Sequence, residues 1–143
     1  MLLLLYNMMN RLFSTIAKKS IINIAPNAWD KMKLIINKNN QFFILSANSG
    51  GCNGFNYELS LNDNVKLEDY IANSNKFPIN IVENNNVKVL IEPTSEFLLI
   101  GTTIDFISED FNKGIFDNKF IFIPDKELNT GCGCGTSFSP KKI

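Results

Sequence analysis

The residues of this sequence best suited to chemistry are its three cysteines, which fall in two short glycine-rich boxes about eighty residues apart. The first box reads Ser49-Gly50-Gly51-Cys52-Asn53-Gly54-Phe55, and the second reads Gly131-Cys132-Gly133-Cys134-Gly135-Thr136-Ser137-Phe138. A thiolate is the form of cysteine that binds metal, and small neighbours leave its sulfur accessible to a large inorganic group. Cys132 and Cys134, two residues apart, can both reach one iron or two adjacent irons. The pattern therefore predicts soft-metal chemistry.

Three thiols are one ligand short of a complete site, because iron–sulfur clusters and Zn²⁺ both usually take four ligands. The chain has no histidine that could supply the fourth. The shortfall indicates a site that is shared between protomers or left open, and either arrangement would hold its cargo loosely. A loosely held cargo suits a carrier better than an electron-transfer protein.

Other thiol chemistries stay open on the residues alone. A structural zinc module would need a fourth ligand from a partner or from a carboxylate. A redox dithiol of Cys132 and Cys134 is conceivable, although a disulfide across one residue would be strained. A cysteine nucleophile would lack the usual imidazole partner, since the chain has no histidine. Idle thiols are the plainest alternative, but small flanking residues cannot pack these sulfurs away as core.

Residues 1–20 differ in composition from the rest of the chain. They hold Arg11, Lys18 and Lys19 and no acid, with hydroxyl and apolar residues between the cations. This composition is typical of a mitochondrial transit peptide, and the run from Arg11 to Ser14 resembles a matrix-protease site cut after Phe13. A secretory signal or a disordered start are the alternatives, but asparagines interrupt the apolar run that a secretory signal needs. We expect a matrix protein whose domain spans residues 21–143.

Composition and charge narrow the function classes for that domain. A chain of 143 residues has the length of one domain, and 45% apolar with 20% charged residues is ordinary for a globular protein. Residues 21–143 hold 11 lysines, no arginine and 14 acids, for a net charge of −3. This balance argues against nucleic-acid binding. No run approaches the ~20 apolar residues that span a membrane, and three cysteines cannot make a complete disulfide framework.

The elements that must position the boxes are one helix followed by short strands. After Pro26, apolar residues recur at helical spacing, which predicts a helix that ends near Asn37. These residues are Ala28, Trp29, Met32, Ile35 and Ile36. Beyond residue 40 the apolar period changes to two, as in the alternating run 55–61. The expected strands are residues 20–24, 41–47, 55–61, 78–83, 87–92, 102–107 and 118–123.

The connections between these strands complete the expected fold. Asn84-Asn85-Asn86 predicts a hairpin turn, because asparagine tolerates positive φ. Pro93 to Gly101 is expected to form a short second helical turn, with Thr94 or Ser95 as its cap. Residues 62–76 are expected to be a polar surface excursion, and the segment from Asp125 a polar, flexible tail that carries the second box. Together these elements predict a mainly β, compact, two-layer sandwich-like domain.

At this point the chain resembles the A-type iron–sulfur carrier family (HesB/IscA-like). The resemblance rests on the run from Gly51 to Tyr57, on the run from Cys132 to Phe138, and on Gly101-Thr102-Thr103-Ile104-Asp105-Phe106 between them. It covers about residues 21–140. The stretch between Tyr57 and Val87 is longer than expected for this family. The double glycine before Cys52 and the ending Ser137-Phe138-Ser139 favour the second of the two mitochondrial subtypes.

The resemblance implies a function as well as a fold. It implies that Cys52, Cys132 and Cys134 bind iron, a 2Fe–2S or a 4Fe–4S cluster at a subunit interface. It also implies transfer of that cargo to apo-proteins during late 4Fe–4S maturation, without enzymatic turnover. The implied partners are a second copy or a second A-type paralogue, a folate-binding-fold assembly protein, a glutaredoxin-type cluster donor and apo-protein clients.

Overall fold

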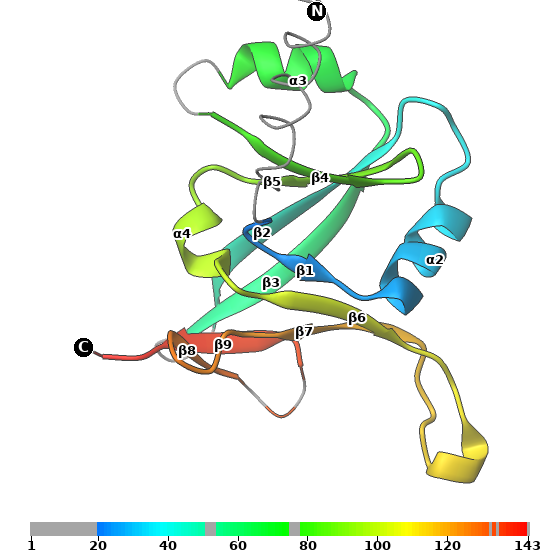
Figure 1. Ribbon diagram of the computed structural model, residues 1–143, viewed down its shortest axis with the longest axis vertical. Coiled ribbons are helices and arrows are strands. Elements are labelled where there is room, and N and C mark those ends of the chain that lie inside the picture. The colour runs from blue at the N-terminus through cyan, green and yellow to red at the C-terminus, as the bar shows by residue number, and fades with distance from the viewer. Residues whose placement is uncertain (1–19, 51–53, 75–77, 132, 134, 143) are drawn as a thin grey trace, which may run out of the picture.

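The computed structural model describes residues 20–50, 54–74, 78–131, 133 and 135–142. Nine strands within these ranges form two sheets, with a six-stranded order β4-β5-β2-β3-β9-β8 and a three-stranded order β1-β6-β7 (Figure 1). The chain is mainly β with few helices, and its large sheet is curled, which confirms the predicted fold class. The strands are β1 (Asn23–Ile24), β2 (Phe42–Gly50), β3 (Gly54–Asn62), β4 (Asn80–Asn84), β5 (Val87–Ile91), β6 (Thr103–Ile107), β7 (Lys119–Ile123), β8 (Asn129–Gly131) and β9 (Ser137–Pro140).

The hydrophobic core is shared by both sheets and by α2 (Pro26–Ile35). Met32 of α2, Leu45 of β2 and Ile104 of β6 are each 0% exposed. The predicted apolar stripe is the reason that α2 packs here, since Ala28 is also fully buried and Trp29 is half-buried against the core. Full burial of a side chain the size of Met32, Leu45 or Ile104 contributes roughly 1.5–3 kcal/mol to stability. The predicted helix is therefore confirmed within a residue or two of its expected ends.

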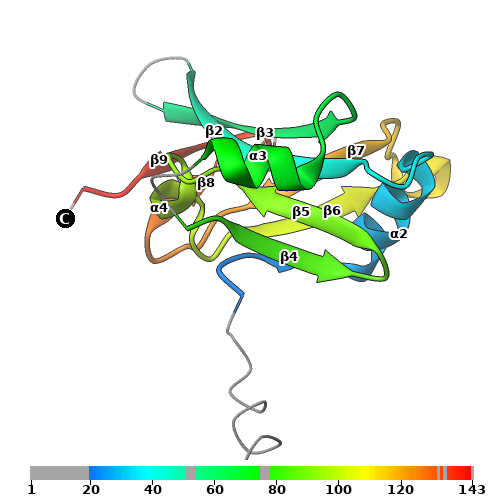
Figure 2. The same ribbon diagram turned by 90° about the horizontal axis from the view of Figure 1, so that it is seen from above.

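The β4–β5 hairpin confirms the turn that the three successive asparagines predict. Asn84 pairs with Val87, and the two residues between them, Asn85 and Asn86, have φ of 47° and 68°. Two successive positive φ values define the tight turn whose twist matches paired strands, and asparagine adopts them at low cost. Figure 2 shows this hairpin from above, with its turn close to α2.

The short helix α4 (Glu96–Leu99) confirms the predicted second helical turn, but its start is held differently from the expectation. Ser95 occupies the N-cap position without capping the helix. Its hydroxyl donates instead to Glu92 Oε2 at 2.5 Å and to the Ala47 carbonyl at 3.3 Å. The side chain thus ties α4 to β2, and the chain then turns at Gly101, where φ is 77°.

One helix was not expected. Within the polar stretch 62–76, the structure has α3 (Leu67–Asn73). Leu67, Tyr70 and Ile71 are spaced to share one helix face, and the Tyr70 ring meets Phe42 edge-on at 5.8 Å. This contact explains why a mostly polar segment folds. None of the helices in the described ranges is long and apolar enough to cross a membrane.

The segment after Pro124, expected to be a flexible polar tail, contains the strands β8 and β9 on either side of the second box. β9 pairs with β3 on one side and with β8 on the other. The physical reason is Phe138, which is 2% exposed and inserts into the core between two polar neighbours. The described parts of the C-terminal segment therefore belong to the large sheet.

Candidate metal centre

The predicted ligands Cys52, Cys132 and Cys134 lie outside the described residues. The described residues nearest to them are Gly50 and Gly54 around the first box and Gly131, Gly133 and Gly135 around the second, and these residues show where each box enters and leaves the fold. The arrangement of the flanking residues is therefore the geometry that bears on the predicted site.

The first box connects two strands of the large sheet. β2 ends at Gly50 and β3 begins at Gly54, and these two glycines are a register pair. A Cβ on Gly50 would lie 2.1 Å from Asn56 Nδ2, and one on Gly54 would lie 3.1 Å from the Phe138 carbonyl oxygen. Glycine at both positions lets the base of this hairpin pack against its own strand and against β9.

The second box is anchored to both sheets. Gly131 ends β8 so close to Pro124 that a Cβ there would lie 3.1 Å from its ring. The Gly135 carbonyl accepts from the Phe122 amide of β7 at 2.9 Å, and the Thr136 carbonyl accepts from the Tyr57 amide of β3 at 2.9 Å. Gly135 has φ of 71°, a conformation that glycine adopts without strain. The described neighbours of Cys134 are therefore held at the junction of the two sheets.

β9 brings the flanks of the two boxes onto neighbouring strands. Phe138 pairs with Phe55 on one side and with Gly131 on the other, so Gly131 and Phe55 lie about 10 Å apart across two strand spacings. Along the strand direction the flanks are offset. The chain enters β3 from the first box at Gly54. The Thr136 carbonyl, by contrast, accepts from the Tyr57 amide, which is three residues or about 10 Å further along β3. The fold thus brings the boxes to one region of the sheet, but it does not superpose their flanks.

An aromatic layer lies under this region. The Phe138 ring stacks on Phe55 at 5.7 Å and on Tyr57 at 4.4 Å, and Tyr57 stacks on Phe122 at 4.8 Å. These rings link β9 to β3 and to the smaller sheet. Burial raises the pKa of the Tyr57 phenol above its ordinary value, and the nearby Thr102 hydroxyl partly opposes that rise. The phenol therefore stays neutral at physiological pH.

The surface beside the second box is apolar. Phe97 and Ile100, three residues apart at α4, are 84% and 37% exposed. The next residue, Gly101, packs against Asp125. The Asp125 carbonyl accepts from the Leu128 amide at 3.2 Å, so Leu128 belongs to the same region, and its side chain is 49% exposed. We call Phe97, Ile100 and Leu128 the α4 patch. It borders β8, the strand that leads into the second box, and can therefore receive another protein surface there.

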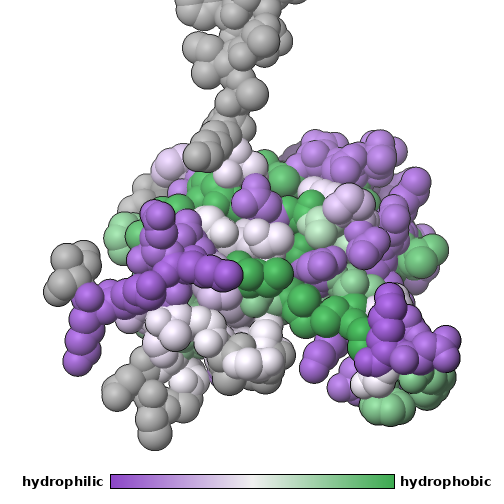
Figure 3. Space-filling view, turned by 60° about the horizontal axis from the view of Figure 1, so that its bottom comes forward, coloured by the Kyte–Doolittle hydropathy of each residue, from purple (hydrophilic) through white to green (hydrophobic). Residues whose placement is uncertain are grey.

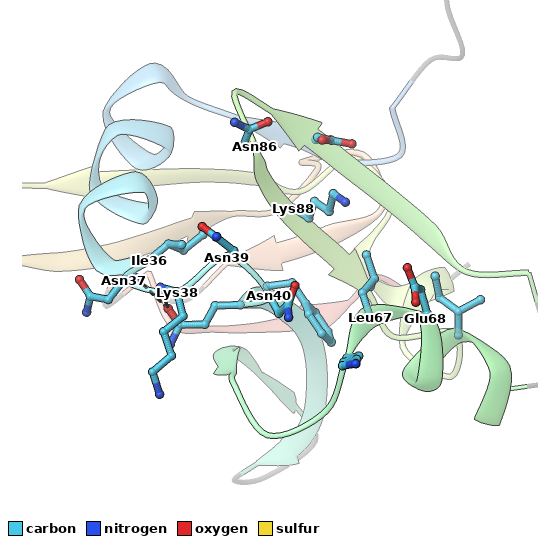
Figure 4. A pocket seen from close by; sticks show the side chains of 14 residues that line it. Ile36, Asn37, Lys38, Asn39, Asn40, Leu67, Glu68, Asn86 and Lys88 are labelled. Carbon is cyan, nitrogen blue, oxygen red and sulfur yellow. Dashed lines mark hydrogen bonds between the residues drawn. The ribbon is translucent and has the colours of Figure 1, made fainter.

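A groove on the opposite part of the molecule is a poorer candidate. It has a volume of about 780 Å³ and lies between the end of α2, β5 and α3 (Figure 4). Its labelled side chains include four asparagine amides, with Lys38, Lys88 and Glu68 also along its walls. Opposite charges and amides at an open surface are typical of a solvated face. We assign it no function.

Two features of the site were not predicted, and only the first of them has a signal in the sequence. Phe138 was read only as part of a family signature, although the alternation Ser137-Phe138-Ser139 is also the period of a half-buried strand. Tyr57 was read as one of several core-facing residues, and nothing in the sequence indicates that its hydroxyl meets Thr102. Across the described part of the chain, no three histidine, cysteine, aspartate or glutamate side chains are grouped to hold a metal ion.

Comparison with known proteins gives a consistent result. The profile of the family described as iron-sulphur cluster biosynthesis matches residues 20–136. The chain is 30% identical over 129 residues to "Iron-sulfur cluster assembly 1 homolog, mitochondrial" of Dictyostelium discoideum, covering 87% of this chain and 82% of that protein. It is 32% identical over 125 residues to "Iron-sulfur cluster insertion protein ErpA" of Ruthia magnifica, covering 85% and 93% respectively.

Solved structures support the fold. The crystal structure of Escherichia coli SufA, described as involved in biosynthesis of iron-sulfur clusters, superposes with a TM-score of 0.60 at 20% identity, covering 87% of this chain and 96% of that one. A crystal structure of IscA with the [2Fe-2S] cluster superposes with a TM-score of 0.59 at 16% identity, covering 85% and 99%. At these identities the likeness shows the fold alone.

Proposed function

The chain belongs to the iron–sulphur cluster biosynthesis family, and from this premise we propose that it binds an iron–sulfur cluster or iron through Cys52, Cys132 and Cys134 and passes it to apo-proteins. The cluster is a cargo in this proposal, and the protein is a carrier rather than an enzyme. The observation that carries the proposal is the position of β9, which joins the flanks of both cysteine boxes within one sheet. A sheet fixes where the boxes enter, and glycine-rich connections leave the thiols accessible.

A second subunit completes the site in this proposal. One chain supplies three thiols where a cluster usually takes four ligands. Thr136, which follows Cys134, is also offset by about 10 Å along β3 from Gly54, which follows Cys52. Both observations favour ligands drawn from two protomers, and the α4 patch gives an apolar surface beside the second box on which they can meet. The second protomer is another copy or an A-type paralogue.

The setting that we propose is the mitochondrial matrix, during late 4Fe–4S maturation. Support comes from relatives named as mitochondrial in Dictyostelium discoideum and Arabidopsis thaliana and from the basic residues 1–20. The match to the iron-sulphur cluster biosynthesis family supports an iron–sulfur cargo, and we propose a 2Fe–2S cluster or a 4Fe–4S cluster built from it. Donors of the glutaredoxin type, a folate-binding-fold partner and apo-protein clients complete the proposed route. The double glycine before Cys52 and the ending Ser137-Phe138-Ser139 support the second mitochondrial subtype as part of this proposal.

Anaerobic reconstitution with iron and sulfide tests the proposal. The full chain is expected to acquire visible absorbance and a cluster signature in Mössbauer spectra. It is then expected to restore activity to an apo-enzyme that needs a 4Fe–4S cluster. Substituting serine for Cys52, Cys132 or Cys134 one at a time is expected to abolish stable binding, because each change removes one ligand per protomer.

The matched control is Ser49→Ala, which alters the first box without touching a thiol and is expected to keep the full spectrum. Retention of that spectrum after any single cysteine substitution would contradict the three-thiol site. A colourless protein that holds zinc at full occupancy would favour a structural zinc module. Activity that persists in Cys52→Ser would favour a redox dithiol of Cys132 and Cys134.

A further inference from the structure

The hairpin between β6 and β7 presents two phenylalanines to solvent. It extends away from the body of the molecule, at the opposite end from β8 and α4 (Figure 1). Phe111 and Phe116 near its tip are 72% and 68% exposed, and their rings meet edge to face at 6.0 Å. The end of the hairpin shows apolar surface bordered by hydrophilic residues (Figure 3). Two large exposed rings on one tip are unusual for a surface that only water contacts.

The backbone of the tip is held in one conformation by hydrogen bonds. The Asp110 amide donates to the Ile115 carbonyl at 3.0 Å, and the Ile115 amide donates to the Asp110 carbonyl at 3.0 Å. Asp110 Oδ1 accepts from the Asn112 amide at 3.1 Å, and Gly114 closes the turn with φ of 70°. The backbone that carries the rings is thus fixed before any partner arrives. Binding through a pre-formed tip loses little conformational entropy.

Size and charge indicate what the tip contacts. Two rings at these exposures present roughly 200–350 Å² on this side of a contact, below the ~800 Å² that each partner buries in a stable interface. The contact is therefore an anchor for a transient partner rather than a permanent subunit interface. The segment from Asp105 to Lys119 has four carboxylates against two lysines, a net charge of −2. Both lysines already pair inside it, Lys113 with Asp110 at 3.5 Å and Lys119 with Asp117 at 3.8 Å.

We propose that the β6–β7 tip docks on a partner protein by inserting Phe111 and Phe116 into an apolar pocket rimmed by lysine or arginine. A negative tip is repelled by anionic lipid, which favours a protein over a membrane surface. The inference does not depend on what the chain carries. Because the tip extends away from β8 and from the β2–β3 end at Gly50 and Gly54, a partner seated on the tip does not cover these described flanks of the cysteine boxes (Figure 1).

The test uses the full chain and the double variant Phe111→Ala/Phe116→Ala. Each is immobilised and exposed to an extract of the host organism, and a protein retained only by the wild type is identified and purified. Its affinity is then measured by calorimetry. The double variant is expected to weaken binding about tenfold or more, since buried aromatic anchors dominate small contacts. Glu109→Gln/Asp117→Asn is expected to weaken it about twofold to fivefold at low salt and less at high salt.

Leu34→Ala is the control, because Leu34 is 76% exposed on α2, outside the tip. It is expected to leave the affinity unchanged within twofold. Urea unfolding verifies that the double variant is folded, as expected for rings that are mostly exposed. Three results would each overturn the proposal: no partner that depends on the tip, a partner whose pocket lacks basic residues, or tip-dependent binding to vesicles of phosphatidylcholine and cardiolipin instead of protein.

Discussion

Tyr57 lies on β3, a few residues after the first cysteine box, and its ring and its hydroxyl have different roles. The ring stacks on Phe138 and Phe122, which belong to different sheets. The hydroxyl and that of Thr102 are buried, and within the described residues neither has a hydrogen bond of normal geometry. Thr102 is nevertheless near enough to oppose the rise in the Tyr57 pKa that burial causes. The ring therefore supplies the stabilisation, and the hydroxyl adds little.

This division predicts the effect of Tyr57→Phe on the free energy of unfolding. A phenol whose pKa is raised by folding contributes stability below its unfolded value of 10.0, and this stability is lost as the pH rises through the folded pKa. Wild type is therefore expected to lose stability above about pH 10 more steeply than Tyr57→Phe. At pH 7 the two proteins are expected to agree within about 1 kcal/mol, because no good hydrogen bond is removed.

Urea titrations from pH 7 to pH 11 measure both expectations. Tyr70→Phe, the same chemical change on α3, controls for the general effect of alkaline pH and is expected to follow wild type. If Tyr57→Phe lost stability above pH 10 as steeply as wild type, the Tyr57 phenol would not be the group responsible.

β9 is the element on which the proposed site depends most. It is four residues long and lies between β3 and β8, so its backbone pairs with flanks of both boxes. A strand this short is held mainly by side-chain packing, and Phe138 is its buried ring. The second box is therefore positioned by a residue that follows it rather than by its own glycines.

Replacing that ring is expected to detach the element. Phe138→Ala should lower the free energy of unfolding by about 3 kcal/mol or more, since it leaves a cavity among stacked rings. Hydrogen exchange at residues 129–131 and 137–140 should rise as β9 loosens. Phe116→Ala makes the same chemical change at a side chain that is 68% exposed, away from the α4 patch, and should alter stability by less than about 0.5 kcal/mol. Equal effects of the two substitutions would contradict the assignment of Phe138 as the anchor.

The elements that the sequence predicted are those whose signals are local. The asparagine turn between β4 and β5 and the apolar stripe of α2 need only their own residues, and both are confirmed. β8 and β9 are three and four residues long, and they form because β9 pairs with β3, far away in the sequence, and β8 pairs with β9. α3 depends likewise on the Tyr70 contact with Phe42. Such short segments carry too little local signal to be predicted alone.

The same distinction between local and non-local signals applies to the candidate site. Residue type and spacing were enough to single out Cys52, Cys132 and Cys134, because thiols on glycine-rich backbone have few other uses. The offset of about 10 Å between the flanks of the boxes follows from how β9 aligns with β3, which is a non-local property. Sequence could therefore single out the candidate ligands, but it could not indicate how their flanking residues are aligned within one protomer.

The whole molecule has two ends with different surfaces. The described flanks of the cysteine boxes and α4 lie toward one end, and the tip of the β6–β7 hairpin lies at the other (Figure 1). In the function that we propose, the protein holds a cargo and engages a partner at the same time. The separation lets a subunit contact and a transient docking contact coexist on one small domain.

The described core of this domain begins at Ile22, which is 1% exposed. Residues 1–19 lie outside the described residues, and no side chain before Ile22 is among the described core. Removing residues 1–19 is expected to leave the midpoint of thermal unfolding unchanged within about 2 °C, because the first residues of a domain usually add little to its stability.

The same truncation is expected to move a fused fluorescent reporter from the mitochondrial matrix to the cytosol, because the basic, acid-free leader is lost. The triple change Arg11→Ala/Lys18→Ala/Lys19→Ala keeps the length and removes only the charge, and it should also abolish import. A reporter that stays in the matrix without residues 1–19 would show that the address lies elsewhere in the chain.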